Sequence, residues 1–126
     1  PPMSVPQAML SGLNFVIVEN LFHSATKGSF RRVTEIAEVS GVLEGKPLTQ
    51  KVYEWEPVSD KLARTKYPIH YLDRLSQLTG HSVADIESEL KKRERFLQGL
   101  VDRGVRDMKT ISGLAQEFIG DLYGRQ

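Results

Sequence analysis

The chain has 126 residues with a formal net charge of +1, and 40% of its residues are hydrophobic and 26% charged. This composition is typical of a globular domain, excludes a wholly disordered or collagen-like chain, and implies no polyelectrolyte partner. The absence of cysteine excludes disulfides, thiolate metal sites and cysteine nucleophiles.

The N-terminal third predicts a short helix followed by a strand. Residues 1–11 read as a proline-punctuated entry and a short helix, with Ser4 as a candidate cap and Gly12 as its end. The chain begins with Pro1-Pro2 instead of methionine, which suggests a piece of a longer protein, although a trimmed terminus would look the same. Residues 13–23 are rich in β-branched and aromatic side chains and predict a strand. Their longest apolar run is far shorter than the ~20 residues needed to cross a bilayer.

The stretch from Phe30 to Gly41, F-R-R-V-T-E-I-A-E-V-S-G, carries two arginines and two glutamates among apolar residues. Its apolar spacing also fits a helix, but its position between two β-rich runs joined by short turns favours a strand. The turn before it contains Lys27-Gly28. In a regular strand the side chains alternate, with one face carrying Arg31, Val33, Glu35, Ala37 and Val39 and the other carrying Arg32, Thr34, Ile36 and Glu38.

A third strand is predicted over residues 48–55, after a turn at residues 44–47. Residues 58–66 read as a polar connection. The sequence therefore predicts an α+β fold, in which a short antiparallel meander over residues 13–55 is followed by a three-helix unit. The expected domains are residues 1–57 and 58–126.

Three helices are predicted after Pro57. The first runs from Pro68 to Gly80, the second starts at the capping-box pair Ser82 and Asp85 and ends near Arg103, and the third is capped by Asp107. Apolar residues lie along one side of the second helix, at Val83, Ile86, Leu90, Leu97 and Val101. A broader apolar stripe follows the third helix, at Ile111, Leu114, Ala115, Phe118, Ile119 and Leu122.

No complete catalytic constellation is present in the sequence. The segment G-V-L-E-G-K at residues 41–46 is one residue too short between its glycines for a phosphate loop, and Pro47 stands where a magnesium-binding Ser or Thr would be needed. A tight turn explains it better. The histidines at positions 23, 70 and 81 are scattered and show no metal-ligand spacing. No metal site and no catalytic residue is predicted.

A basic cluster on the second helix, formed by Lys91, Lys92, Arg93 and Arg95, suggests nucleic-acid binding as an alternative. From His81 to Gln126, however, eight basic residues stand against eight acidic ones, and a duplex-binding module normally carries an excess of positive charge. A solvated helix face with salt bridges is the better interpretation, and we expect no nucleic-acid partner.

Arg31, Arg32, Glu35 and Glu38 are the candidate site residues. In one interpretation they form a cross-strand ladder of ion pairs with a purely structural role. In the other, one arginine reaches a nucleotide or a neighbouring subunit and the carboxylates orient it, because a planar guanidinium suits phosphate recognition. The sequence leaves both interpretations open.

Several stretches resemble the C-terminal part of the archaeal secretion ATPases, the motors of archaeal type IV pili and of the archaellum within the type II/IV secretion ATPase superfamily. These stretches, in order along nearly the whole chain, are P-P-M-S-V-P-Q-A-M-L, L-N-F-V-I-V-E-N, R-R-V-T-E-I-A-E-V-S-G, V-Y-E-W-E-P-V-S-D, L-T-G-H-S-V-A-D-I-E-S-E-L-K-K-R-E-R-F-L and G-V-R-D-M-K-T-I. The arginine-glutamate strand is the most specific of them.

The resemblance implies a fragment of a hexameric ATPase, holding the last strands of its RecA-like sheet in residues 1–57 and a C-terminal helical subdomain in residues 58–126. In that family the Walker A loop, the acidic motifs and the histidine box precede this stretch, so the fragment itself is expected to be inactive and to hold no cofactor. ATP and Mg²⁺ would belong to the parent protein. The implied partners are other subunits of a homo-hexamer and a membrane platform protein, at the cytoplasmic face of the membrane. A free-standing helical interaction or nucleic-acid-binding module is the alternative.

Overall fold

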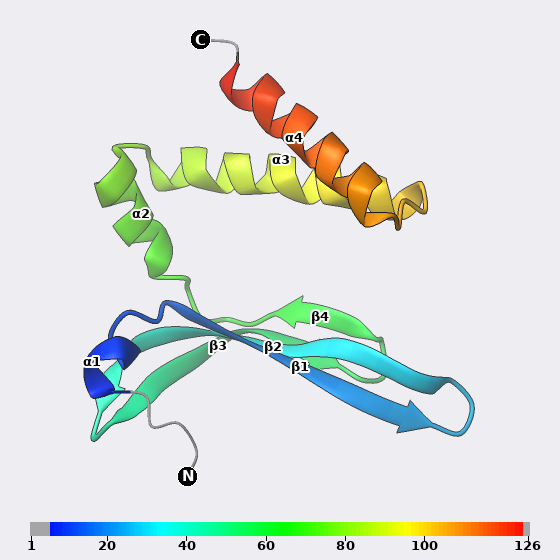
Figure 1. The fold of residues 1–126 in the computed structure, drawn as a ribbon. Helices are drawn as coiled ribbons and strands as arrows, with labels where there is room; N and C mark the ends of the chain where they lie inside the picture. The colour runs from blue at the N-terminus through cyan, green and yellow to red at the C-terminus, as the bar shows by residue number, and fades with distance from the viewer. Residues whose placement is uncertain (1–5, 125–126) are drawn as a thin grey trace. The chain divides into compact units, whose positions relative to one another are not determined.

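The computed structural model describes residues 6–124, and the predicted α+β fold is confirmed (Figure 1). The chain forms two compact units, of which the first ends at Arg74 and the second begins at Leu75. The elements, in chain order, are α1 (Gln7–Leu10), β1 (Phe15–Ser24), β2 (Gly28–Leu43), β3 (Lys46–Glu56), β4 (Lys61–Arg64), α2 (Tyr71–Thr79), α3 (Val83–Asp102) and α4 (Met108–Tyr123).

The first unit is built on one antiparallel sheet in which the strands follow chain order, β1-β2-β3-β4 (Figure 1). The stretch from Phe30 to Gly41 lies within the 16-residue strand β2, so the strand prediction is confirmed and the helical alternative is wrong. The β2–β3 turn consists of Glu44 and Gly45, whose φ values of 51° and 75° match the two-residue turn that continues the twist of a hairpin. Short turns therefore make β2 one of the two inner strands of the meander.

Three bulges interrupt the ladder and break the predicted regular alternation of β2. Thr34 is the extra residue opposite β1, whereas Val52 of β3 and Ser40 of β2 are the extra residues where these two strands pair. The bulge at Val52 bends the ladder beside Ala37 and Glu38, and both of these consecutive residues are buried. Both residues are therefore covered although they are consecutive in the strand, and the start of α2 covers Glu38.

Strand β4 corrects the prediction of a polar connection over residues 58–66. Lys61 to Arg64 pair with Glu56 to Tyr53 of β3, which adds a fourth strand to the sheet. No apolar run marks this strand, because it has only four residues and two of them are charged. The sheet and its following segment extend as one unit to Arg74, beyond the expected domain boundary at residue 57.

The helix starts agree with the capping signals. Ser82 and Asp85 form the predicted capping box of α3, and the Asp107 side chain accepts the backbone N–H of Thr110 at the start of α4. Helix α2, in contrast, begins at Tyr71, so the prediction that it starts at Pro68 is wrong by three residues. Ser4, the candidate cap of the first helix, lies outside the described residues. Among residues 6–124, none of the helices has the length and apolar character that a membrane-spanning helix requires.

Helices α3 and α4 form an antiparallel hairpin in the second unit. The rings of Phe96 and Phe118 stack with centroids 4.4 Å apart, and Leu100 is buried. The predicted stripe of α4 is half-buried except at Ile119, which is exposed. Along the predicted stripe of α3, in contrast, Leu90, Leu97 and Val101 are exposed.

Candidate functional site

Arg31 lies on β2 opposite Leu21 and extends into solvent. Its side chain is 71% exposed, and its Nη1 is 3.3 Å from Oε1 of Glu19, which is itself 52% exposed. An ion pair this exposed is screened by water and salt and contributes about 0–1 kcal/mol at most. Arg31 is therefore held weakly and can exchange Glu19 for another anionic partner.

Arg32, in contrast, is fixed by a bidentate ion pair. Its Nε and Nη2 each lie 2.7 Å from a carboxylate oxygen of Asp60, and its Nη1 donates to the backbone oxygen of Arg31 at 2.8 Å. The indole Nε1 of Trp55 donates to the same Asp60 carboxylate at 2.9 Å, and the Arg32 guanidinium lies 5.0 Å from the centroid of the Phe30 ring. An arginine–carboxylate ion pair is strongest when it is planar and bidentate. Arg32 therefore stabilises the fold of the sheet.

The hydrogen bonds from Arg32 hold the pKa of Asp60 well below its usual range, and the hydrogen bond from Trp55 makes a smaller contribution in the same direction. The hydrogen bond to Asp60 in turn raises the pKa of Arg32. The Asp60 carboxylate thus contributes stability above its unfolded-state pKa of about 3.9, and this contribution is lost as the pH falls through the lower folded-state pKa.

We expect Asp60→Asn to lower the unfolding midpoint at pH 7 and to differ less from the parent sequence at pH 3, where Asp60 is protonated in the unfolded chain and part of its contribution to stability is lost. Asparagine tolerates the left-handed backbone at this position, φ 52°, so the change removes charge without adding strain. Urea unfolding followed by the fluorescence of Trp55, the one tryptophan of the chain, measures the difference. Asp121→Asn on α4 is the control for the loss of one carboxylate. An equal difference at both pH values would contradict the role of the ion pair.

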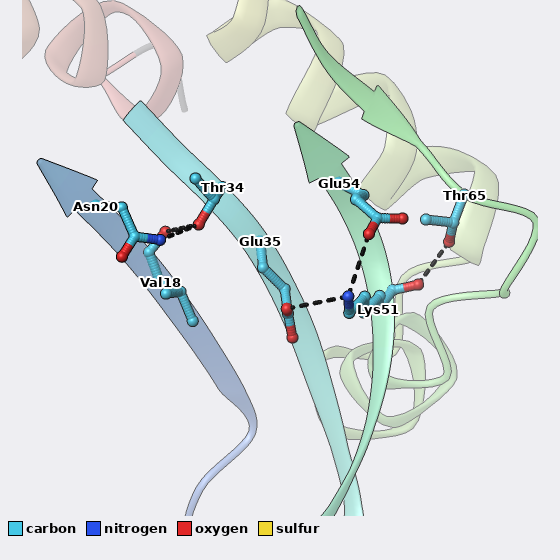
Figure 2. A network of polar contacts seen from close by, with 7 residues as sticks. All are labelled: Val18, Asn20, Thr34, Glu35, Lys51, Glu54 and Thr65. Atoms are coloured by element: carbon cyan, nitrogen blue, oxygen red, sulfur yellow. Dashed lines mark hydrogen bonds and ion pairs between the residues drawn. The ribbon is translucent and has the colours of Figure 1, made fainter. Parts of the chain in front are cut away.

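Glu35 takes part in a three-residue network across β2 and β3 (Figure 2). The Nζ of Lys51 lies 3.1 Å from Oε1 of Glu54 and 3.4 Å from Oε2 of Glu35. The Glu54 hydrogen bond, with the charge of Glu35 adding to it, raises the pKa of Lys51. Glu35 and Glu54 face each other in the register, so Lys51 relieves the repulsion between two like charges.

Polar contacts on both sides extend this network across the sheet (Figure 2). The Nδ2 of Asn20 donates to Oγ1 of Thr34 at 2.7 Å, which ties β1 to the bulged residue of β2, and Oγ1 of Thr65 donates to the backbone oxygen of Lys51 at 2.6 Å. The Thr34 hydroxyl also lies 3.4 Å from the backbone oxygen of Val18, so the hydroxyls of Thr34 and Thr65 supply donors to backbone oxygens near the bulge and the end of β4.

Glu38 is the buried member of the four charged residues, at 6% exposure. Its two carboxylate oxygens accept the backbone N–H groups of His70, at 2.9 Å, and Tyr71, at 2.7 Å. These are N–H groups at the start of α2, which have no partner inside a helix, and the positive end of the helix favours a carboxylate there. The Tyr71 ring also meets Phe15 edge-on, with centroids 5.5 Å apart. Glu38 therefore anchors the first turn of α2 to the sheet.

The structure brings all four predicted residues onto β2 but gives them separate partners. Within residues 6–124, no ion pair joins any two of the four side chains. The partners that sequence reasoning missed are Glu19, Asp60, Lys51 and the backbone of α2. Asp60 is 28 residues from Arg32 along the chain, and the turn that carries it offered no apolar or charge pattern that would have identified it.

An open groove of about 570 Å³ lies beside the β3–β4 edge. It is lined by Glu54, Trp55, Glu56, Pro57, Val58, Ala63, Arg64 and Thr65. Arg64 does not offer its Nη1 to this groove for a ligand, because that atom donates to the backbone oxygens of Val52 and Thr65. In the part of the chain that the structure describes, no cluster of three His, Asp or Glu side chains could hold a metal ion.

Comparison with known proteins finds a distant relative. No family model matches the chain. Over 120 residues, or 94% of its length, the chain is 28% identical to the uncharacterized protein MJ0781 of Methanocaldococcus jannaschii. The chain spans only 16% of the length of that relative.

Proposed function

We propose that this chain is the C-terminal part of a hexameric secretion ATPase that couples ATP hydrolysis to the assembly of a pilus or archaellum, or to protein secretion. The stretches that resemble this family coincide with successive elements of the fold. The segment L-N-F-V-I-V-E-N leads into β1, R-R-V-T-E-I-A-E-V-S-G lies in β2, and V-Y-E-W-E-P ends β3. A relative many times longer than this stretch has room for the remaining ATPase domains.

The arrangement of the β2 charges is the observation that supports the proposal most directly. Arg32, Glu35 and Glu38 bind partners inside the chain, whereas Arg31 extends from the sheet with one weak, exposed partner. An arginine on a rigid central strand is suited to reach an anionic group on a nucleotide or a neighbouring subunit, because the strand fixes its position before binding. Arg31 is therefore the residue of the four that we assign to an intermolecular contact.

In the parent protein, ATP and Mg²⁺ would bind to the domains that precede this stretch, and hydrolysis would take place between subunits of a homo-hexamer. The anchored first turn of α2 offers a mechanical link, because the Glu38 contact makes the start of this helix move with the sheet. Through the helices the parent would act on a membrane platform protein, which would hold it peripherally at the cytoplasmic face of the membrane.

The proposal predicts that the purified 126-residue chain neither binds nor hydrolyses ATP, because it lacks a phosphate-binding loop. The intact parent should carry a Walker A sequence upstream of this stretch and should show magnesium-dependent turnover. Nucleotide binding by calorimetry and phosphate release by both proteins measure the difference. Turnover by the isolated chain, or a parent without an upstream phosphate loop, would overturn the proposal. A salt-dependent gel shift of the isolated chain with duplex DNA would favour a nucleic-acid-binding module instead.

A further inference from the structure

The apolar stripe of α3 does not face α4. Phe96 stacks on Phe118 of α4 and Leu100 is buried, whereas Leu90, Leu97 and Val101 lie roughly 100° around the helix from these two residues, as the 3.6-residue period requires. These three side chains are 51%, 55% and 70% exposed. A helix of the second unit therefore carries a second apolar side that its partner helix leaves uncovered.

Helix α4 repeats this pattern on the same side of the hairpin. Phe118 faces α3, whereas Ile119 and Tyr123 are exposed, at 50% and 63%. On each helix, the exposed stripe follows the contact side in the same rotational direction when viewed from the N-terminus. Because the two helices run in opposite directions, both stripes therefore lie on the same side of the helix pair. The hydrogen bond from Nη2 of Arg93 to Oη of Tyr123, 3.1 Å long, joins the helices along this side. We call it the apolar hairpin face, formed by Leu90, Leu97, Val101, Met108, Ile119 and Tyr123.

A two-helix layer cannot bury a face of this kind by itself, and stable helical domains add a further layer of helices. Between Leu75 and Gly124, Leu100 is the one apolar residue of the second unit that is buried. The six side chains of the apolar hairpin face together expose on the order of 700 Å², so complete burial of two such faces would remove at most about 1,400 Å² from solvent, within the range of stable specific interfaces.

We infer that the apolar hairpin face is the contact surface for a second copy of this chain, which packs on it as an antiparallel four-helix arrangement. The balance of eight basic and eight acidic residues from His81 to Gln126 argues against an anionic membrane surface or nucleic acid, both of which select an excess of Lys and Arg. A twofold axis near the middle of α3 places Leu90 of one copy against Leu97 of the other. It also brings Lys91 close to Glu94 of the other copy, so the rims of the two faces are complementary in charge.

The test uses the complete 126-residue chain without nucleotide, so its outcome is independent of the proposed ATPase role. Sedimentation and light scattering should show a monomer–dimer equilibrium. Leu97→Glu should weaken the dimer by at least about tenfold, because it places a charge in the centre of the interface. Leu97 is already half exposed in one copy, so the variant should keep its helical circular dichroism. Ser88→Glu adds the same charge on the opposite, exposed side of α3 and should leave the dimer unchanged.

Thiol crosslinking gives a second readout, since the chain has no cysteine of its own. Leu97→Cys should be joined to a second copy by a short bismaleimide, and Ser88→Cys should not. A wild-type chain that stays monomeric at millimolar concentration would overturn the inference. A dimer that Leu97→Glu and Ser88→Glu weaken equally would also overturn it. A dimer that is unaffected by Leu97→Glu but is lost in the Ile17→Glu variant would place the interface on the sheet instead.

Discussion

Glu38→Ala is expected to lower the free energy of unfolding of the first unit by about 1–3 kcal/mol, because the backbone N–H groups of His70 and Tyr71 lose their acceptor at a partly buried site. The same change should detach the start of α2 from the sheet. Urea unfolding followed by the fluorescence of Trp55 measures the first effect, and amide hydrogen exchange at His70 and Tyr71 measures the second, since both amides should exchange faster.

Two matched variants separate this anchor from a general loss of charge. Glu35→Ala removes a carboxylate of the same strand, but Lys51 keeps Glu54 as a partner, so the loss of stability should stay below about 1 kcal/mol. Glu38→Gln keeps one acceptor oxygen and should fall between the two alanine variants. If Glu38→Ala is no less stable than Glu35→Ala, or if the amides of His70 and Tyr71 keep their protection, Glu38 does not anchor α2.

Arg31→Ala in the intact parent protein is expected to lower ATP turnover by at least about tenfold, and by up to about 10³-fold if its guanidinium meets a phosphate in the transition state. Its unfolding midpoint should stay close to that of the unchanged protein, because the pair with Glu19 is exposed and weak. Steady-state hydrolysis and thermal unfolding of the same preparations test the two halves of this prediction.

Arg32→Ala is the neighbouring comparison and should behave in the opposite way. It leaves Asp60 without its bidentate partner and should reduce stability first, with turnover falling in step with the folded fraction. Arg31→Lys keeps the charge but not the planar donor pair, so a partial loss of turnover would indicate recognition of an oxyanion. If Arg31→Ala and Arg32→Ala lose turnover and stability in parallel, the β2 charges form a structural ladder and have no intermolecular role.

Local patterns were sufficient for much of the fold. The capping pairs at Ser82 and Asp107 locate two helix starts, and the turns at Gly28 and Gly45 set the hairpins on both sides of β2, because these signals act between residues close in the chain. Strand β4 was not predicted because its formation depends on a neighbouring strand and not on a local pattern. Four residues, two of them charged, form a strand here only because β3 lies beside them.

The candidate site divides in the same way. The sequence by itself determined that β2 concentrates charge in the centre of a meander and that the helical part is neutral with amphipathic helices. Only the tertiary structure decided which charge is bound and which extends outward, because the partners of Arg32 and Glu38 lie 28 to 33 residues away and are brought near by the sheet. It also decided that the stripe at Leu90, Leu97 and Val101 faces away from α4, since periodicity identifies an apolar side of a helix but not what covers it.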